Sequence, residues 1–210
     1  LNHGNEALIE FNNIYDTGYM QSDGAIIQCM VGQQPGVEIR DNWLHNTIKY
    51  GARFDGNGEG NNGLMHHNVI WNVEGGIMVK GYNHSLYNNT AFDNGSKNDI
   101  IVMIDQGGNQ GTSTKNNAAN KISGHRSGTY NDYPVPGNYE NNWNGYETGI
   151  DIKSLLIDPE NYDFRPLPNS LLVNAGINIE GINDDYVGEA PDLGAYEHGG
   201  EFWVAGISWD

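Results

Sequence analysis

The sequence predicts an all-β protein, a right-handed parallel β-helix of about five or six coils with a C-terminal capping segment. First, an Asn recurs at intervals of 21 to 29 residues, at Asn13, Asn42, Asn68, Asn89, Asn117 and Asn142. Second, strand-length apolar runs alternate with Gly/Asn turns, and helical periodicity is nearly absent. Third, a unit of this size cannot bury its apolar side alone, whereas coils stacked ~4.8 Å apart share one continuous core.

The repeated Asn has a structural explanation in such a fold. Asn tolerates the left-handed turn between two strands, and its side-chain amide can bond to the Asn of the next coil. About ten residues after each early Asn comes a short strand-like run. These runs begin at Gly24, Gly51, Gly76 and Asp99.

Composition limits the function. The 210 residues suit one domain, and 10 Lys plus Arg against 27 Asp plus Glu give a net charge of −17. This charge argues against nucleic acid, which proteins bind by neutralising phosphates, and against anionic membrane surfaces. No apolar run approaches the ~20 residues of a membrane span. Divalent cations and neutral sugars fit an acidic surface, while an acidic substrate needs local cations.

Three segments make up the expected domain: β-helix coils over 1–123, a long loop and last coil over 124–150, and a cap or tail over 151–210. The tail should shield the last coil, because an open end exposes unpaired strand edges. The chain begins with Leu1-Asn-His-Gly, in the style of its interior, and shows no signal peptide or N-terminal cap. We therefore expect a fragment or processed product, with missing coils or a partner chain at that end.

Several segments resemble right-handed parallel β-helix repeat proteins, which include polysaccharide lyases and some glycoside hydrolases. The resemblance covers roughly residues 5–200. It rests on Val37-Glu-Ile-Arg-Asp-Asn-Trp-Leu-His-Asn46, Met65-His-His-Asn-Val-Ile-Trp-Asn72, Leu86-Tyr-Asn-Asn-Thr-Ala-Phe-Asp-Asn94 and the tail motifs Asp158–Arg165, Asn174-Ala-Gly176 and Pro191–Glu197. The tail is similar to the closing segment of secreted bacterial members. The resemblance implies a secreted or cell-surface protein that acts on polysaccharide, but it does not match any one catalytic set.

Aligning the four runs on Gly24, Gly51, Gly76 and Asp99 separates two faces. Odd offsets form a core column of Ala25, Ile27, Cys29, Ala52, Phe54, Ile77, Val79, Ile100, Val102 and Ile104. Even offsets are expected to face solvent. They form the rows Ile26/Arg53/Met78/Ile101, Gln28/Asp55/Lys80/Met103 and Met30/Asn57/Tyr82/Asp105. Cys29 is expected to be a buried small hydrophobe.

The outward rows predict a patch of Arg53, Asp55, Lys80, Tyr82 and Asp105. In an eliminative cleavage, Arg53 would neutralise a substrate carboxylate, Lys80 would be the base and Tyr82 the acid. In a hydrolysis, Asp55 and Asp105 would be the acid and base, more than ~8 Å apart as in inverting enzymes. The structural alternative is a cross-coil Asp55–Lys80 ion pair on a solvated face, which contributes under ~1 kcal/mol.

The segment Phe54-Asp-Gly-Asn-Gly-Glu-Gly-Asn-Asn-Gly63 is expected first to be a loop between strands. Asp55, Asn57 and Glu59 alternate with Gly as in the first half of an EF-hand loop, and they predict a Ca²⁺ site. Position twelve, where a Glu would complete the cage, is His66.

The remaining candidate side chains divide into substrate contacts and packing residues. Tyr19, Tyr50, Gln28 and His84 are the expected substrate-binding residues around the patch, with the two tyrosines stacking on sugar rings. Adjacent residues on a strand point to opposite faces, so His66 and His67 are not expected to share an ion, and no zinc spacing is present. His45 aligns with Trp71 and Phe92 in a partly buried row. Trp43 is expected to pack beside Ile14, Val69 and Thr90.

The sequence thus predicts an extracellular carbohydrate-active β-helix that cleaves a polysaccharide by elimination or hydrolysis. The alternative is a non-catalytic glycan-binding or structural β-helix within a larger surface protein. Fold alone does not decide between them.

Overall fold

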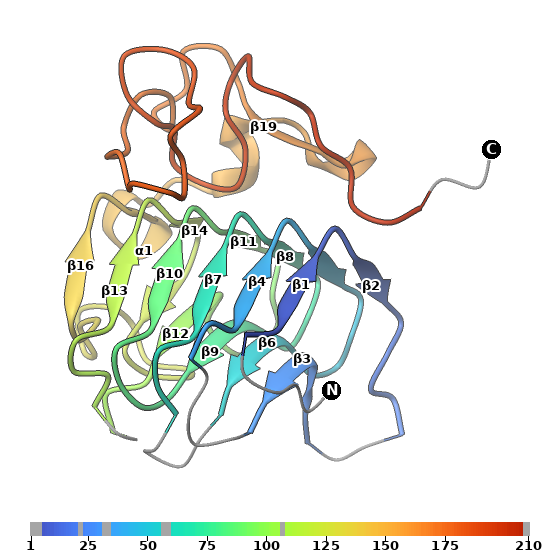
Figure 1. The fold of residues 1–210 in the computed structure, drawn as a ribbon, viewed down its shortest axis with the longest axis vertical. Coiled ribbons are helices and arrows are strands. Elements are labelled where there is room, and N and C mark those ends of the chain that lie inside the picture. The colour runs from blue at the N-terminus through green and yellow to red at the C-terminus, as the bar shows by residue number, and fades with distance from the viewer. Residues whose placement is uncertain (1–5, 21–22, 31–34, 56–59, 106–107, 208–210) are drawn as a thin grey trace.

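The predicted fold class is confirmed: the chain is a parallel β-helix (Figure 1). The computed structural model describes residues 6–20, 23–30, 35–55, 60–105 and 108–207. Within these ranges the chain winds through three parallel sheets in turn, and each coil except the last adds one strand to each sheet. No helix among the described residues is long and apolar enough to cross a membrane.

The first sheet runs along the front of Figure 1. Its strands, in spatial order, are β1 (Leu8–Glu10), β4 (Glu38–Arg40), β7 (Leu64–His66), β10 (Ser85–Tyr87), β13 (Ser113–Lys115) and β16 (Asn138–Glu140). The second sheet holds β2 (Asn13–Tyr15), β5 (Trp43–His45), β8 (Val69–Trp71), β11 (Thr90–Phe92), β14 (Ala118–Ala119) and β17 (Trp143–Asn144). The third sheet holds β3 (Ala25–Cys29), β6 (Tyr50–Phe54), β9 (Gly75–Val79), β12 (Ile100–Val102) and β15 (Ile122–Ser123).

Alternation along the short strands builds one continuous core. The central residues of the first two sheets and alternate residues of the third meet inside the coils. Cys29 is fully buried there, as expected, and burial raises the pKa of its thiol to about 12. Ile104 is an exception, because β12 ends at Val102 and the Ile104 side chain is 44% exposed.

An asparagine ladder forms the corner between the first and second sheets. It begins at Asn12, not at Asn13 as the repeat suggested, and continues through Asn42, Asn68, Asn89, Asn117 and Asn142. Each side-chain amide donates to the Oδ1 of the next ladder residue at 2.9–3.0 Å. The same oxygens also accept backbone N–H groups, so the ladder satisfies polar atoms in every coil.

The left-handed backbone belongs to the residue before each ladder Asn, which corrects the expectation that the ladder Asn itself adopts it. These residues are Phe11, Asp41, His67, Asn88, Asn116 and Asn141, with φ between 48° and 56°. A second left-handed column follows the second sheet at Asp16, Asn46, Asn72 and Asp93. Asn and Asp predominate because they tolerate this conformation best.

In the third sheet, the predicted register is confirmed for three of the four aligned strands. Arg53 pairs with Met78, and Met78 with Ile101, as predicted. The first strand is displaced by two residues from the expected register, so that Gln28, not Ile26, lies beside Arg53. A two-residue shift preserves the faces, because side chains alternate with period two.

The tail lies lengthwise against the outer side of the second sheet, where it also packs on Trp143 of the last coil (Figure 1). It begins after α1 (Gly145–Thr148) with two short 3-10 helices, Ile152–Leu155 and Pro159–Asn161. Between these two helices lies β18 (Leu156–Asp158), which pairs antiparallel with β19 (Asp163–Pro166). Near its end, the Gly206 N–H donates to the carbonyl oxygen of Phe11 in the first described coil at 2.8 Å.

Aromatic side chains join the tail to the second sheet. Trp43 is buried, as expected, but it points outward beneath the tail and lies beside Asn13, not Ile14. Its indole N–H donates to the Tyr196 hydroxyl at 3.1 Å, and Phe164 packs edge-on against it. The expected row is present: His45 stacks on Trp71, which stacks on Phe92.

Candidate functional site

The candidate site is an ionic cluster on the outer face of the third sheet, formed by Arg53, Asp55 and Lys80. Backbone bonds from Asp55 N to the Cys29 oxygen (2.8 Å) and from Lys80 N to the Phe54 oxygen (2.9 Å) continue the ladder pattern just beyond β6 and β9. These bonds keep residues of adjacent coils in register. Asp55 and Lys80 therefore become neighbours across coils, as the sequence predicted.

Asp55 is shared by two cations. Its Oδ2 lies 2.6 Å from Arg53 Nη2, and its Oδ1 pairs with Lys80 Nζ. Gln28 Nε2 also donates to Oδ2 at 3.4 Å. The Arg53 guanidinium carbon lies 5.1 Å from the centre of the Tyr50 ring, a cation–π arrangement. The cluster thus has two positive groups around one carboxylate.

The cluster is buried, which corrects the expectation of a solvated face. The side chains of Arg53, Asp55 and Lys80 are 4%, 8% and 8% exposed. The rest of this face is apolar, because Tyr50, Met78, Ile101 and Met103 form a separate buried cluster on it. Residues after β15 lie at its edge, where Asn98 N donates to the Arg126 oxygen at 2.8 Å.

Burial changes the energetics of the ion pairs. Charges removed from water lose hydration, so a buried pair is weak evidence for stability, although removing one partner costs about 3–5 kcal/mol. The surface value expected for Asp55–Lys80 does not apply here.

Asp23 connects the cluster to solvent, and the sequence analysis missed it. Its Oδ1 lies 2.9 Å from Arg53 Nη1, yet the Asp23 side chain is 79% exposed. The hydrogen bond and charge of Arg53 lower the pKa of Asp23 below its ordinary value. One edge of the buried guanidinium therefore binds a carboxylate at the surface. Strand alternation gave no signal for this contact, because Asp23 lies before β3 and Gln28 is the strand neighbour of Arg53.

The remaining predicted residues lie at different depths. Tyr50 is a strand residue, only 8% exposed beneath Arg53, and so is not an open sugar platform, whereas Tyr19 is 57% exposed. Tyr82, two residues after Lys80, is partly buried, and its N–H donates to the Gly60 oxygen. Asp105 is exposed and forms no ion pair with any residue that the structure describes.

His84 does not border the patch, because its side chain is fully buried. Its Nδ1 accepts from Gly63 N at 3.2 Å, so the Nε2–H donates to the Lys80 oxygen at 2.8 Å. Burial lowers the pKa of His84 to about 4. The neutral ring joins the backbone before β7 to the backbone after β9, which makes His84 a positioning residue.

The calcium prediction is only partly covered by the described residues. Asn57 and Glu59 lie outside them, and the Asp55 carboxylate is held by Arg53 and Lys80. Within the described ranges, no three His, Cys, Asp or Glu side chains are grouped so as to hold a metal ion. The calcium site at Asp55, Asn57 and Glu59 therefore stays a prediction.

Sequence comparison finds distant relatives among characterised proteins. The chain is 29% identical to "Pectate lyase L" of Dickeya chrysanthemi and 28% identical to that of Dickeya dadantii (strain 3937), in each case over 193 residues. The alignments cover 77% of this chain but only 42% of each relative, so the chain spans well under half their length. No family model matches the sequence, and no solved structure gives a significant match. The chain is a parallel β-helix with distant similarity to pectate lyase L, a polysaccharide lyase.

Proposed function

We propose that this chain cleaves an acidic polysaccharide by β-elimination at the Arg53–Asp55–Lys80 cluster. The main support is the position of the Arg53 guanidinium. One of its nitrogens contacts the buried Asp55, and another contacts the exposed Asp23 carboxylate. A substrate carboxylate can replace Asp23 there. The similarity to pectate lyase L supports this substrate class, since pectate is a polymer of uronic acid.

The chemistry follows from the position of the charges. Arg53 binds the uronate carboxylate and stabilises the negative charge that develops when the neighbouring C5 loses its proton. Within their ion pair, Lys80 passes its own proton to the Asp55 carboxylate, and the neutral amine then takes the C5 proton. The C5–H electrons form the C4=C5 double bond, and the C4–O4 bond breaks. Tyr82 protonates the departing oxygen.

Hydrolysis is less well supported. Both oxygens of Asp55 contact cations, and Asp105 is exposed, so the two carboxyl groups do not have the contrasting environments of an acid–base pair. The non-catalytic alternative is a glycan-binding β-helix that keeps the cluster without turnover. A secreted or cell-surface location belongs to the same proposal, because polymers of this kind are extracellular.

The test is the ultraviolet absorbance of the new C4=C5 bond while the protein is incubated with a panel of uronic-acid polymers. Each assay is run with added calcium and with a chelator, which also tests the Asp55, Asn57 and Glu59 prediction. Absorbance should rise, and the rise should disappear in Lys80→Ala and fall strongly in Tyr82→Phe. Lys115→Ala, which removes a lysine of the first sheet paired with Glu140, is the matched control.

Two results would reject the proposal. New reducing ends without absorbance would indicate hydrolysis. A flat trace without new ends on every polymer would leave the binding or structural alternative for this chain.

A further inference from the structure

A cavity of about 320 Å³ lies between the tail and the corner that joins the first two sheets. The coils contribute Arg40, Asp41, His66 and His67 to its wall, and the tail contributes residues between Gly181 and Trp203. Its volume falls at the lower end of small-molecule pockets, roughly 300–1,000 Å³. The tail and the third sheet lie on opposite sides of the coils in Figure 1, so this cavity is separate from the ionic cluster.

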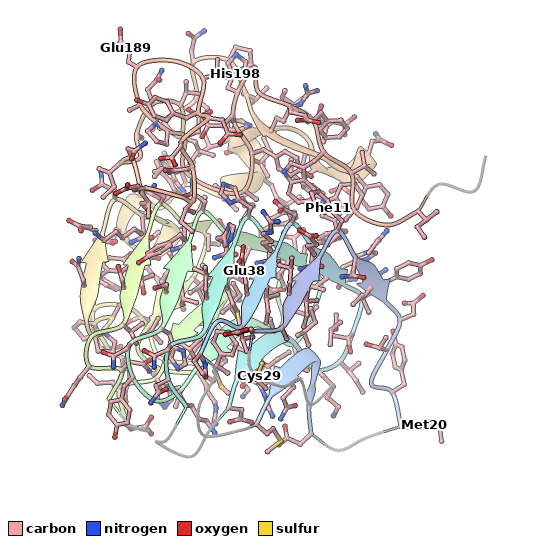
Figure 2. All side chains as sticks on the ribbon, in the orientation of Figure 1. Phe11, Met20, Cys29, Glu38, Glu189 and His198 are labelled. Carbon is pink, nitrogen blue, oxygen red and sulfur yellow. The ribbon has the colours of Figure 1, made fainter. Side chains whose placement is uncertain are left out.

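The two adjacent histidines meet at this cavity, contrary to the expectation of opposite faces. His67 occupies the left-handed corner position, which turns its ring back toward its neighbour, and the two Nδ1 atoms lie 2.8 Å apart. His66 Nε2 lies 2.9 Å from Glu38 Oε1. Figure 2 labels Glu38 on the front of the first sheet.

The hydrogen-bond partners of His66 and His67 show which ring nitrogen of each carries the proton. Glu38 accepts, so His66 carries its proton on Nε2 and presents a lone pair at Nδ1. His67 must then donate from Nδ1, which leaves its Nε2 as an acceptor. This Nε2 makes no hydrogen bond with any residue of the described ranges. Burial lowers the pKa of both rings, that of His67 to about 3, which keeps them neutral.

Other groups of the wall are also acceptors. Glu197 Oε1 accepts from Asp192 N at 2.9 Å, whereas the buried Oε2 has no hydrogen-bond partner in the described part of the chain. The wall also contains the carboxyl groups of Asp41, Asp185 and Glu201. The one arginine, Arg40, already contacts Glu10 at 2.6 Å and Glu38 at 3.2 Å. A free acceptor, an unpartnered carboxyl oxygen and an engaged arginine favour a ligand rich in hydroxyl donors and without negative charge.

Aromatic side chains complete the wall. Tyr196 is buried, Trp203 is partly buried, and their rings stack 4.3 Å apart. Sites for small molecules combine apolar ring surfaces with a few placed polar groups. Hydroxyl donors on a compact ring with apolar C–H faces match this combination.

We propose that this cavity binds a neutral sugar ring, either a free saccharide or an uncharged unit of a glycan. His67 Nε2 and the Glu197 carboxyl accept its hydroxyl groups. This second site does not depend on the elimination chemistry. It selects for neutral sugars, whereas the ionic cluster selects for carboxylates.

Binding is measured without turnover, by titrating the protein with galactose and with galacturonate. The two sugars share one ring and differ by a carboxylate. The experiment is run at about pH 8, where Asp41 and Glu197, whose pKa values burial raises to about 6 and about 7, are ionised. Calorimetry gives the affinity, and the ¹⁵N shifts of the histidine rings locate the site. Galactose should bind, shift the His66 and His67 resonances, and bind about tenfold more tightly than galacturonate.

Two variants test the acceptors. His67→Asn removes Nε2 but keeps the turn, since Asn stands at the equivalent left-handed positions 88, 116 and 141. Glu197→Gln is isosteric and retains the bond from Asp192 N. Each should weaken galactose binding about tenfold, while Lys115→Ala should not. Absence of galactose binding, equal binding of galacturonate, or unchanged binding in both variants would overturn the proposal, and none of these results bears on elimination.

Discussion

The outer faces of the second and third sheets are built on the same coils, and both are buried, yet by different means. On the second sheet, Trp43 and Trp71 are covered by aromatic rings of the tail, including Phe164. On the third sheet, apolar side chains share the face with Arg53, Asp55 and Lys80. Aromatic burial stabilises a fold directly, whereas buried ions roughly balance their desolvation cost. The comparison gives one face a structural role, whereas the other is the face on which we propose the chemistry.

The aromatic face should give the largest loss of stability. Trp43→Ala removes a buried ring and its bond to Tyr196, which should lower the free energy of unfolding by about 3–5 kcal/mol. Denaturant unfolding measures this, and limited proteolysis should show cleavage within residues 151–207. An unchanged midpoint would mean that the tail contributes nothing to the coils. Tyr19→Phe, which removes an exposed hydroxyl bound to the Asn46 oxygen, is the aromatic control.

The ionic face should respond almost as strongly when one charge is removed. Asp55→Ala leaves Arg53 and Lys80 buried without their shared acceptor, at a cost of about 3 kcal/mol. This is the lower end of the usual range, because Arg53 still has Asp23. Asp105→Ala, an exposed carboxylate without an ion pair in the described structure, should change stability by less than about 0.5 kcal/mol. Equal effects of the two variants would contradict the burial of Asp55.

The pH dependence of stability should reveal a buried carboxyl group that lies outside the cluster. Asp99, at the start of β12, is fully buried, and burial raises its pKa to about 7 from an ordinary value of 3.8. Its contribution is therefore complete below about pH 4 and is lost as pH rises through 7, at up to about 1.4 kcal/mol per pH unit. Asp99→Asn should flatten the decline of stability between pH 4 and 7. An identical slope in variant and parent would show that Asp99 titrates normally.

Among the residues that contact Arg53, the smallest effect on stability is expected at Asp23. Its side chain is largely exposed, so Asp23→Ala should change the free energy of unfolding by less than about 1 kcal/mol. The same change frees one edge of Arg53 for substrate. If the proposed function is right, the polymer concentration for half-maximal rate should fall. A rise would mean that Asp23 helps to bind substrate.

The repeat made the fold predictable because every coil must bury the same apolar face and form the same turns. Five of the six ladder positions and three of the four third-sheet strands were placed correctly. Asn12 and the first strand were misplaced because neighbouring residues, such as Asn12 and Asn13, fit the pattern equally well. One-dimensional periodicity cannot resolve such a choice.

The site was less predictable because its burial depends on contacts distant in sequence. The alternation placed Arg53, Asp55 and Lys80 on one outward face, but not the apolar surroundings that bury them. The meeting of His66 and His67 depends on a left-handed backbone at His67, which the alternation of side chains along a strand does not predict. The tail's course along the second sheet has no signature in the repeat.

The most direct test replaces the whole cluster with apolar residues, in the variant Arg53→Met/Asp55→Leu/Lys80→Met, and measures stability and elimination on the same sample. Apolar replacement of a complete buried ionic group is often neutral or stabilising by about 1–4 kcal/mol. The account predicts a melting temperature equal to or above that of the parent and complete loss of eliminative cleavage. A folded variant that still cleaves, or a parent that never cleaves, would contradict the chemical role assigned to the third sheet.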